Sequence, residues 1–299
     1  MLHVSPNVRR NFINGILFAS PWFLGFIVFT VYPILASLYF SFTKYSVLAP
    51  PRWVGLSNYV KLLTGDYMFP VAIHNTIYYA ALALPLGILS SISLALLLNK
   101  RLLGMSIYRT IFYLPNILPA VAMSLLWLWL LNPNYGVFNS ILTGLGLPAI
   151  PWLTSPRWSK PSLIIMSMWG IGGSMVIYLA GLQDMPQHLY EAAEIDGANA
   201  WQKTRNITLP MLTPTIFFDL VMGLIGVFSY FTQAFIMTNG GPLNSTTFYM
   251  LYLYQNAFVY FKMGYASAMA WILFVIVVTL TLLVFKSSGR WVYYGGATA

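Results

Sequence analysis

The sequence predicts an all-α integral membrane protein with six transmembrane helices and a cytoplasmic helix–turn–helix loop between the fourth and fifth. Three observations predict this fold. Of the 299 residues, 59% are hydrophobic and 7% are charged, whereas a typical soluble domain has about 25% charged residues. The mean hydropathy is +0.72. The apolar residues are also gathered into long blocks, as membrane-spanning segments require.

Six apolar blocks are long enough to cross a bilayer, which takes roughly 20 mostly apolar residues in a helix. They cover about residues 15–39, 73–98, 111–131, 161–183, 213–236 and 265–286. The first block is longer than the ~7–15 apolar residues of a signal peptide, and no small-x-small cleavage site follows it. We therefore expect it to be retained, and residues 1–299 to form a single transmembrane domain.

The distribution of cations predicts that both termini lie in the cytoplasm. Six spans place both ends of the chain on one side of the membrane. That side holds most of the cations, namely Arg9, Arg10, Lys100, Arg101, Arg109, Lys203, Arg205, Lys286 and Arg290. The other side holds Lys44, Arg52, Lys61, Arg157, Lys160 and Lys262. Cytoplasmic loops carry the excess of Lys and Arg, so topology explains the net charge of +9 without nucleic-acid binding.

Several functional classes lack the residues they require. The sequence has no cysteine, which excludes disulfides, thiolate metal sites and thiol nucleophiles. His3, His74 and His188 are too scattered to indicate a metal site. A Gly-x-x-x-x-Gly-Lys-Ser/Thr phosphate loop is absent, and the glycine-rich stretch 170–173 lies inside a predicted span without a lysine. We therefore expect no catalytic residue, no metal and no cofactor in this chain.

The predicted outer loops differ from the cytoplasmic ones in composition. Residues 40–72, 132–160 and 237–264 are rich in Pro, Gly, Trp and Tyr, as segments at a membrane interface tend to be. The stretch Phe248–Phe261 is apolar and aromatic but too short to span the membrane. We expect it to form a helix lying at the outer surface.

The cytoplasmic loop 184–210 is the polar, acid-bearing segment of the chain. It holds four of the six acidic residues, namely Asp184, Glu191, Glu194 and Asp196. Pro186 is predicted to be the first residue of a helix, with Asp184 near its cap. Gly197 is predicted to end that helix in a left-handed conformation. A second helix, about 199–208, follows. These residues suit either a plain connecting loop or a surface that binds a partner.

The order of residues in this loop favours the second interpretation. Glu191-Ala192-Ala193, then Asp196-Gly197, then Ile207-Thr208-Leu209-Pro210 resembles the EAA signature of binding-protein-dependent ABC transporter permeases. Other motifs resemble the carbohydrate branch of that family, in particular the first membrane subunit of maltose and glycerol-phosphate importers: Tyr32-Pro33, Trp53-Val54-Gly55-Leu56, Asn75-Thr76, Leu114-Pro115 and Asn239-Gly240-Gly241-Pro242. Thr204 and Arg205 depart from the family, which usually has an aromatic residue there.

The resemblance implies a permease subunit of an ATP-driven sugar or oligosaccharide importer in the prokaryotic cytoplasmic (inner) membrane. In such importers a second homologous permease subunit completes the pathway, and two ATPase subunits bind ATP and Mg. An extracytoplasmic sugar-binding protein delivers the substrate. The residues implied to couple this chain to the ATPase are Glu191, Ala192, Ala193, Asp196, Gly197, Ile207, Leu209 and Pro210. The family plan leaves the sugar open, and also whether one ATPase is used twice.

A substrate pathway is expected near the middle of the membrane, between this subunit and its homologous partner, with lining residues from the fourth and fifth predicted spans. By position, the resemblance implies a lining of Trp169, Gly170, Gly173, Gly223, Val227, Tyr230 and Gln233. Gly223, Val227 and Tyr230 share one helical face, and among the lining residues Tyr230 and Gln233 offer the polar groups that a hydroxylated ligand needs. The competing interpretation is close helix packing, which small residues in membrane helices usually mark.

Asp219 is the one acid inside a predicted span. Intramembrane carboxylates are candidates for function, such as proton coupling, but this one lies about two turns from the cytoplasmic end, where pairing or solvation suffices. A secondary transporter driven by an ion gradient remains an alternative. It would be favoured by more intramembrane ionisable residues, by broken helices in pairs and by an internal repeat, whereas the sequence shows one such acid and no obvious repeat. An importer of polypeptides, amino acids or ions that is powered by ATPase subunits in the same way is a further alternative.

Overall fold

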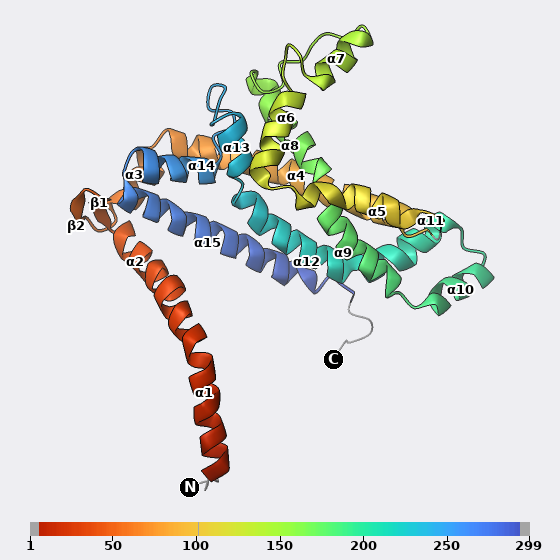
Figure 1. Ribbon diagram of the computed structural model, residues 1–299, viewed down its shortest axis with the longest axis horizontal. Helices are drawn as coiled ribbons and strands as arrows, with labels where there is room; N and C mark the ends of the chain where they lie inside the picture. The colour runs from red at the N-terminus through yellow and green to blue at the C-terminus, as the bar shows by residue number, and fades with distance from the viewer. Residues whose placement is uncertain (1–5, 101, 294–299) are drawn as a thin grey trace. The chain divides into compact units, whose positions relative to one another are not determined.

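The computed structural model of the protein describes residues 6–100 and 102–293, without the side chains of residues 6–9 and of Ile13. These residues are mostly helical, as predicted, and include one two-stranded sheet. They form two compact units (Figure 1). One holds the residues up to Gly65 and Leu253–Ile272, and the other holds Asp66–Tyr252 and the residues from Leu273 onward. The Arg9 side chain and Arg101, both assigned to the cytoplasmic side, lie outside the described residues.

The first unit begins with a long apolar helix. It comprises α1 (Pro6–Phe26), a π-helical turn (Ile27–Val31) and α2 (Tyr32–Ser41), of which Arg10–Ser41 forms a candidate membrane span of 32 residues. At 1.5 Å per residue this helix is about 48 Å long, more than a bilayer core needs. Its apolar side chains are exposed, and Phe18 reaches 90%. Such a surface suits lipid or another membrane protein rather than water.

A β-hairpin follows this helix where only an outer loop was predicted. It consists of β1 (Thr43–Ser46) and β2 (Ala49–Trp53), paired antiparallel, and α3 (Ser57–Thr64) comes next. The Asn58 amide donates to the carbonyl oxygens of Ser41 and Thr43, each at 2.9 Å. Pro50 and Pro51 argue against a central strand, but they are tolerated because each strand of a two-stranded sheet is an edge.

The second unit is arranged around α4 (Met68–Leu98), which packs against α8, α9 and α12. These helices lie side by side in Figure 1. In chain order the remaining elements are α5 (Met105–Tyr113), a 3₁₀ turn (Leu114–Ile117), α6 (Ala120–Leu130), α7 (Val137–Gly144), α8 (Pro156–Trp169), α9 (Gly172–Gln183), α10 (Gln187–Ile195), α11 (Ala200–Lys203), a π-helical turn (Thr204–Thr208), α12 (Leu209–Phe228), α13 (Thr232–Met237) and α14 (Tyr249–Tyr254). A further π-helical turn (Gln255–Val259) and α15 (Met263–Ser288) complete the described chain, and α15 contributes to both units.

Two hydrophobic clusters pack against α4, one around its middle and one toward its C-terminal end. One gathers Tyr79 and Ala83 with Trp127, Trp152 and other residues from α6, α8 and α13. The other gathers Ile92 and Ala95 with side chains from α9 and α12, including the fully buried Tyr178. The part of α4 around Gly87 contributes no buried residue to either cluster.

Four described helices are long and apolar enough to cross a membrane without interruption, and two further pairs qualify when each bent pair is taken as one span. The predicted helix 111–131 is one of these pairs, because the chain bends by 101° between Ile117 and Ala120. Pro119 explains the bend: a residue that precedes proline is pushed out of the helical region, and Leu118 is extended with ψ 131°. Hydropathy alone does not predict this bend, because the residues on both sides of it are apolar.

The predicted helix 161–183 is also broken, by 45° between Trp169 and Gly172. The Asn116 side chain spans the break. With its amide oriented to satisfy all partners, it donates to Gly170 O at 2.9 Å and accepts from the backbone N–H groups of Gly172 and Gly173 at 3.2 and 2.9 Å. An unpaired backbone group in an apolar environment is costly, so this one amide makes the break tolerable.

The predicted boundary between the second cytoplasmic helix and the fifth span is wrong. We expected the helix to end before Pro210, but the helical chain continues past Pro210 into α12 and is continuous over Ala200–Phe228. The π-helical turn Thr204–Thr208 provides the explanation, since Leu209 N–H bonds to Thr204 O five residues back. A proline in a regular helix removes one hydrogen bond and clashes with the carbonyl group of the preceding turn. The wider π-helical turn gives the proline ring the space it needs.

The outer aromatic segment is helical, as predicted, but part of it is buried rather than spread on a surface. Phe248, Tyr249 and Leu251 are at most 1% exposed. The loop before it is held by Asn75, whose amide donates to Asn244 O at 2.8 Å and Thr247 O at 3.1 Å. Buried aromatic residues and this amide therefore fasten the segment to α4.

Gly172 provides a test of the broken span. A Cβ at this position would collide with the Phe112 carbonyl oxygen, whereas one at Gly226 in α12 would meet nothing within 4 Å. We predict that Gly172→Ala lowers the unfolding temperature of the purified protein, by an overpacking cost of about 1–3 kcal/mol. Gly226→Ala is the matched control and should leave the unfolding temperature unchanged or slightly higher. Equal unfolding temperatures for the two variants would contradict this account of the break.

Candidate functional site

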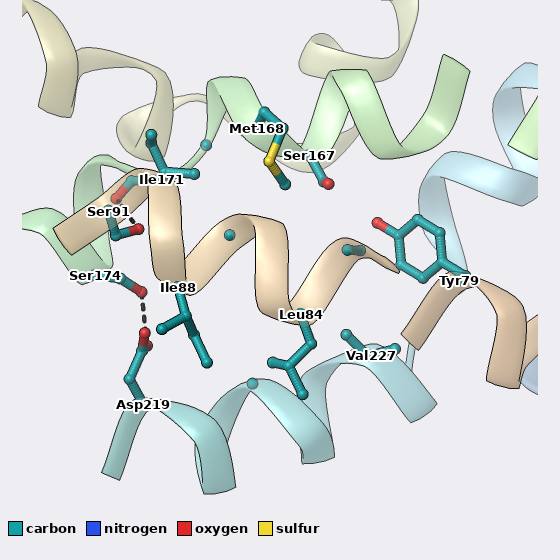
Figure 2. A pocket seen from close by; sticks show the side chains of 14 residues that line it. Tyr79, Leu84, Ile88, Ser91, Ser167, Met168, Ile171, Ser174, Asp219 and Val227 are labelled. Carbon is teal, nitrogen blue, oxygen red and sulfur yellow. Dashed lines mark hydrogen bonds between the residues drawn. The ribbon is translucent and has the colours of Figure 1, made fainter. Parts of the chain in front are cut away.

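A cavity of about 180 Å³ lies at the middle of α4, between the two hydrophobic clusters. Figure 2 shows side chains from α4, from the α8–α9 break and from α12 around it. Its lining consists of Tyr79, Ala83, Leu84, Gly87, Ile88, Ser91, Ser167, Met168, Gly170, Ile171, Ser174, Asp219, Gly223 and Val227. Hydroxyl groups and one carboxylate thus face a pocket whose other walls are apolar. Specific polar groups in an apolar pocket are typical of small-molecule sites.

A second cavity of about 200 Å³ shares part of its wall with the first. Its lining is Met123, Met166, Ser167, Gly170, Tyr230 and Gln233. Ser167 and Gly170 line both cavities. The size of the side chains at these two positions therefore decides whether the cavities are connected. The break in the fourth span brings Gly170 to this shared wall.

Five of the seven predicted pathway residues line these cavities, and two do not. Gly170, Gly223 and Val227 line the first cavity, and Gly170, Tyr230 and Gln233 line the second. Trp169 instead packs edge-on against Trp127, with ring centroids 5.8 Å apart. Gly173 faces the Asn116 side-chain amide, one atom of which would lie 3.2 Å from a Cβ at that position.

The glycines of the lining have two different roles. A Cβ at Gly223 would lie 2.5 Å from Leu84 Cδ1, so Gly223 allows close packing of α12 on α4. A Cβ at Gly170 would meet only Ser167 O, at 3.6 Å, which is ordinary contact. Close helix packing therefore accounts for Gly223, as the competing interpretation held, but it does not account for Gly170. Gly170 leaves open space.

Tyr230 brings an aromatic side chain to the second cavity. Its ring stacks on Tyr79, with centroids 4.4 Å apart, and meets Phe248 edge-on at 5.3 Å. Its hydroxyl oxygen is buried and lies near the Tyr79 hydroxyl, without a well-formed hydrogen bond to it. A buried polar group without a well-formed hydrogen bond is costly.

Asp219 is fully engaged by two neighbouring side chains. Ser174 Oγ donates to one carboxylate oxygen at 2.7 Å, and Tyr178 Oη donates to the other at 2.8 Å. Both donors belong to α9, so the carboxylate ties α12 to α9 while also lining the first cavity. These bonds support the structural interpretation of this intramembrane acid over proton coupling.

Sequence reasoning missed several polar residues of this site. Ser167 and Ser174 belong to the same span as the predicted glycines, and Tyr79 and Ser91 come from α4. The spacing of Ser174 and Tyr178, one turn apart, places two hydroxyl groups on one face of an apolar helix. That pattern was the available signal for a buried polar partner such as Asp219.

The loop 184–210, which the sequence predicts to be cytoplasmic, forms a helix, a glycine turn and a second helix. Gly197 has φ 76°, which confirms the predicted left-handed conformation, and its N–H bonds to Glu194 O at 3.0 Å. Pro186, however, is the N-cap of α10 rather than its first residue, and Asp184 makes no side-chain cap. The second helix begins at a capping box of Asn199 and Gln202 that was not predicted.

Part of the loop is anchored and part is free. The Tyr190 hydroxyl lies 2.9 Å from Thr208 Oγ1, which joins α10 to the base of the fifth span. The exposed residues Glu191, Ala192, Asp196 and Gly197 lie on the outside, and Ile195 is 87% exposed. Ala193, Ile207, Leu209 and Pro210 are half-buried. The outer side of α10 is therefore accessible, with Ile195 exposed between acidic residues.

One ion pair lies within the loop. Lys203 Nζ donates to Glu194 Oε1 at 2.8 Å, and this hydrogen bond, with the charge of the lysine, holds the pKa of Glu194 below its usual value. The pair is solvent-exposed and therefore contributes little to stability. Among the described residues no group of three His, Cys, Asp or Glu side chains is placed to hold a metal ion.

Comparison with known proteins places these features in a family. The sequence profile described as "Binding-protein-dependent transport system inner membrane component" matches residues 83–292. The probable ABC transporter permease protein YesP of Bacillus subtilis is 44% identical, over 97% of this chain and 95% of that protein. The sulfoquinovosyl glycerol transport system permease protein SmoG of Agrobacterium fabrum is 31% identical, over 89% and 87%.

A solved structure agrees with the sequence matches. A chain of the bacterial alginate ABC transporter, crystallised in complex with an alginate pentasaccharide-bound periplasmic protein, superposes with a TM-score of 0.84 at 27% identity. The match covers 95% of this chain and 96% of that chain.

The Asp219 bonds predict the effects of two substitutions. In Asp219→Leu the hydroxyls of Ser174 and Tyr178 lose their acceptor, at a cost of about 1–3 kcal/mol for each buried group. Asp219→Asn keeps a carbonyl oxygen, and a hydroxyl can turn to accept from its amide. We therefore expect the unfolding temperature to fall clearly for Leu and little for Asn. If both variants instead abolish activity while their unfolding temperatures stay equal, the carboxylate acts in proton transfer and the structural role is wrong.

Proposed function

The chain belongs to the family of binding-protein-dependent transport system inner membrane components, and from that premise we propose how it works. It is an ABC transporter permease subunit that imports sugars or oligosaccharides and lines the translocation pathway together with a second, homologous permease subunit. Relatives named for sulfoquinovosyl glycerol and alginate support a carbohydrate substrate. No observation on the described residues favours a transporter driven by an ion gradient.

The exposed cytoplasmic loop is the observation that carries this proposal. A transport subunit without a phosphate loop must receive energy from an ATPase through a contact surface. Here α10 presents Glu191 and Ala192 to the outside, turns sharply at Gly197, and is anchored through Tyr190 to the start of the fifth span. A rigid, exposed helix attached to the membrane core transmits movement from a partner. We assign this role to the loop residues from Glu191 to Pro210 that carry the family signature.

The two cavities form this subunit's part of the pathway in the proposal. Gly170 provides space at their shared wall, and Tyr230 and Gln233 offer hydrogen-bonding groups to sugar hydroxyls. Aromatic rings such as those of Tyr79 and Tyr230 provide flat apolar surfaces against which sugar rings pack. Trp169 and Gly173, which line neither cavity, are not part of this proposal.

The remaining partners follow from the family plan. We propose that two ATPase subunits bind ATP and Mg outside this chain, so the chain itself needs no cofactor and catalyses no reaction. An extracytoplasmic sugar-binding protein delivers substrate, as supported by the solved alginate transporter with its periplasmic protein. Both termini lie in the cytoplasm, since Arg10, Lys100, Arg109 and Lys286 would then face it.

The direct test is ATP hydrolysis by the assembled transporter in lipid vesicles. The permease pair and its ATPases are reconstituted, and sugar-binding proteins loaded with candidate saccharides are added from the outer side. We expect one loaded binding protein to stimulate hydrolysis and to produce uptake of its sugar. If no ATPase co-purifies and uptake follows an imposed ion gradient, the proposed function fails.

Gly197→Asp tests the role of the loop. The variant is predicted to insert normally and to keep ATP hydrolysis, but to lose sugar uptake by about tenfold or more, because a side chain and a charge enter the turn against the ATPase. The matched control is Gly146→Asp, in a predicted outer loop. Gly146 has φ 77° and no atom within 4 Å of its Cβ position, so it shares the backbone strain of Gly197, at 76°, without its location. Normal uptake by Gly197→Asp, or an equal loss in both variants, contradicts the assignment.

Gly170→Leu tests the pathway. A leucine side chain enters the space shared by the two cavities, so we predict a strong loss of uptake. Stimulation of ATP hydrolysis by the loaded binding protein should remain, because the loop is unchanged. Gly170→Ala is the control, since its Cβ meets only an ordinary contact. Unimpaired uptake in Gly170→Leu would remove Gly170 from the pathway.

A further inference from the structure

A third cavity, of about 660 Å³, lies behind the cytoplasmic loop in the second unit. Its lining is Leu96, Asn99, Lys100, Leu102, Met105, Arg109, Leu182, Gln183, Met185, Gln187, Tyr190 and Thr208. These residues come from the cytoplasmic ends of α4 and α9, the beginning of α5 and the beginning of α10. The cavity is separate from the two assigned to the pathway and shares no lining residue with them.

The charged groups of this cavity have one sign. Lys100 and Arg109 line it, and no carboxylate does among the described residues. Arg109 is fixed in place, because its Nη2 and Nε atoms donate to Leu98 O at 2.9 and 3.3 Å. Its remaining N–H groups and the Lys100 ammonium are donors directed at a space large enough for a bound molecule.

The neutral polar groups of the wall are donors as well. The side-chain amides of Asn99, Gln183 and Gln187 each carry an NH₂ group, and all three residues line the cavity. Amide and cationic donors around one space match the several acceptor oxygens of a phosphate group, which binds them more strongly than neutral partners bind each other. The polar part of the lining is thus suited to a phosphate-bearing anion.

The rest of the lining is apolar. Leu96, Leu102, Met105, Leu182 and Met185 form a wall next to the cationic groups. This combination lies where two membrane-spanning helices reach the proposed cytoplasmic surface. Basic pockets between membrane helices on that side are suited to acidic lipid headgroups, with acyl chains along the apolar wall.

We propose that this cavity binds a phosphate group, either of an acidic phospholipid of the inner leaflet or of a soluble phosphate compound. The bound group would be held by Lys100, Arg109 and the neighbouring amides, and it would touch Gln187 and Tyr190 of α10. The site is therefore next to the helix that the proposed function couples to the ATPase. Its cytoplasmic location rests on that proposed function.

The test uses the assembled transporter, purified in detergent and supplied with phosphatidylglycerol, with phosphatidylcholine, or with inorganic phosphate. Native mass spectrometry measures lipid binding, and the unfolding temperature at constant ionic strength measures the effect of phosphate. The variants are Lys100→Gln, which removes a cation, and Gln187→Glu, which adds an anion to the wall. Lys286→Gln is the matched control, because it removes an exposed cation from the same predicted side outside the cavity.

We expect both cavity variants to weaken phosphatidylglycerol binding by about fivefold, the effect of one lysine near an anionic surface, and the control to bind as the unchanged protein does. A variant-sensitive rise in unfolding temperature with inorganic phosphate, without selective lipid binding, identifies a soluble ligand instead. Equal binding by all variants, or an equal loss in Lys286→Gln, overturns the proposal. So does a failure of the assembled complex to bind either probe, because the ATPase then fills the cavity.

Lipid and phosphate binding are measured without sugar, binding protein or ATP, so the outcome is independent of transport. A complex that binds phosphatidylglycerol through Lys100 but imports no sugar leaves this cavity assigned and removes the proposed function. A complex that imports sugar, but in which all variants bind phosphatidylglycerol equally, keeps the proposed function and removes this binding site.

Discussion

The satisfaction of backbone hydrogen bonds inside an apolar layer is the constraint on which the centre of this molecule depends. A break in a membrane helix leaves N–H and C=O groups unpaired, and no water is there to accept them. The Asn116 amide meets three of these groups, on Gly170, Gly172 and Gly173. With those groups paired, the fourth span can bend, Gly170 can remain without a side chain, and two cavities can share its position. The space in the core therefore depends on one side-chain amide, that of Asn116.

The same helices that enclose the cavities also reach the cytoplasmic loop. Helix α9 runs from the break to the start of the loop, and α12 runs from the end of the loop back to the second cavity. The Asp219 carboxylate joins the two helices partway along, through Ser174 and Tyr178. The Tyr190 hydroxyl and Thr208 Oγ1, 2.9 Å apart, join α10 to the π-helical turn that precedes α12. Helices α9 and α12 are thus joined directly at Asp219 and indirectly through α10, and in the proposed function this connection couples the loop to the pathway.

Features that depend on local sequence were predictable, and those that depend on a distant partner were not. Gly197 was predicted because a positive φ is a property of one residue and its neighbours. The broken fourth span was missed because its cause, Asn116, lies over 50 residues from Gly170 in the sequence. The bend at Pro119 was a local signal that hydropathy ignores, and Pro210 was read as a helix end because the π-helical turn that accommodates it has no simple signature. Trp169 was predicted to line the pathway, but it lines neither cavity, and its ring packs on Trp127, a contact that the sequence does not reveal.

The distribution of burial indicates why this chain needs partners. Its long first helix exposes residues such as Phe18 and Trp22 along its length, and the loop exposes Ile195 and Trp201. The two surfaces differ in kind. The first is apolar throughout and fits lipid or another membrane helix, whereas the second places isolated apolar residues among charges and fits a groove on a water-soluble protein. In the proposed function, the second permease subunit completes the two cavities, which have volumes of about 180 and 200 Å³. The apolar first helix is then covered by lipid or by a membrane subunit, and the loop by the ATPase.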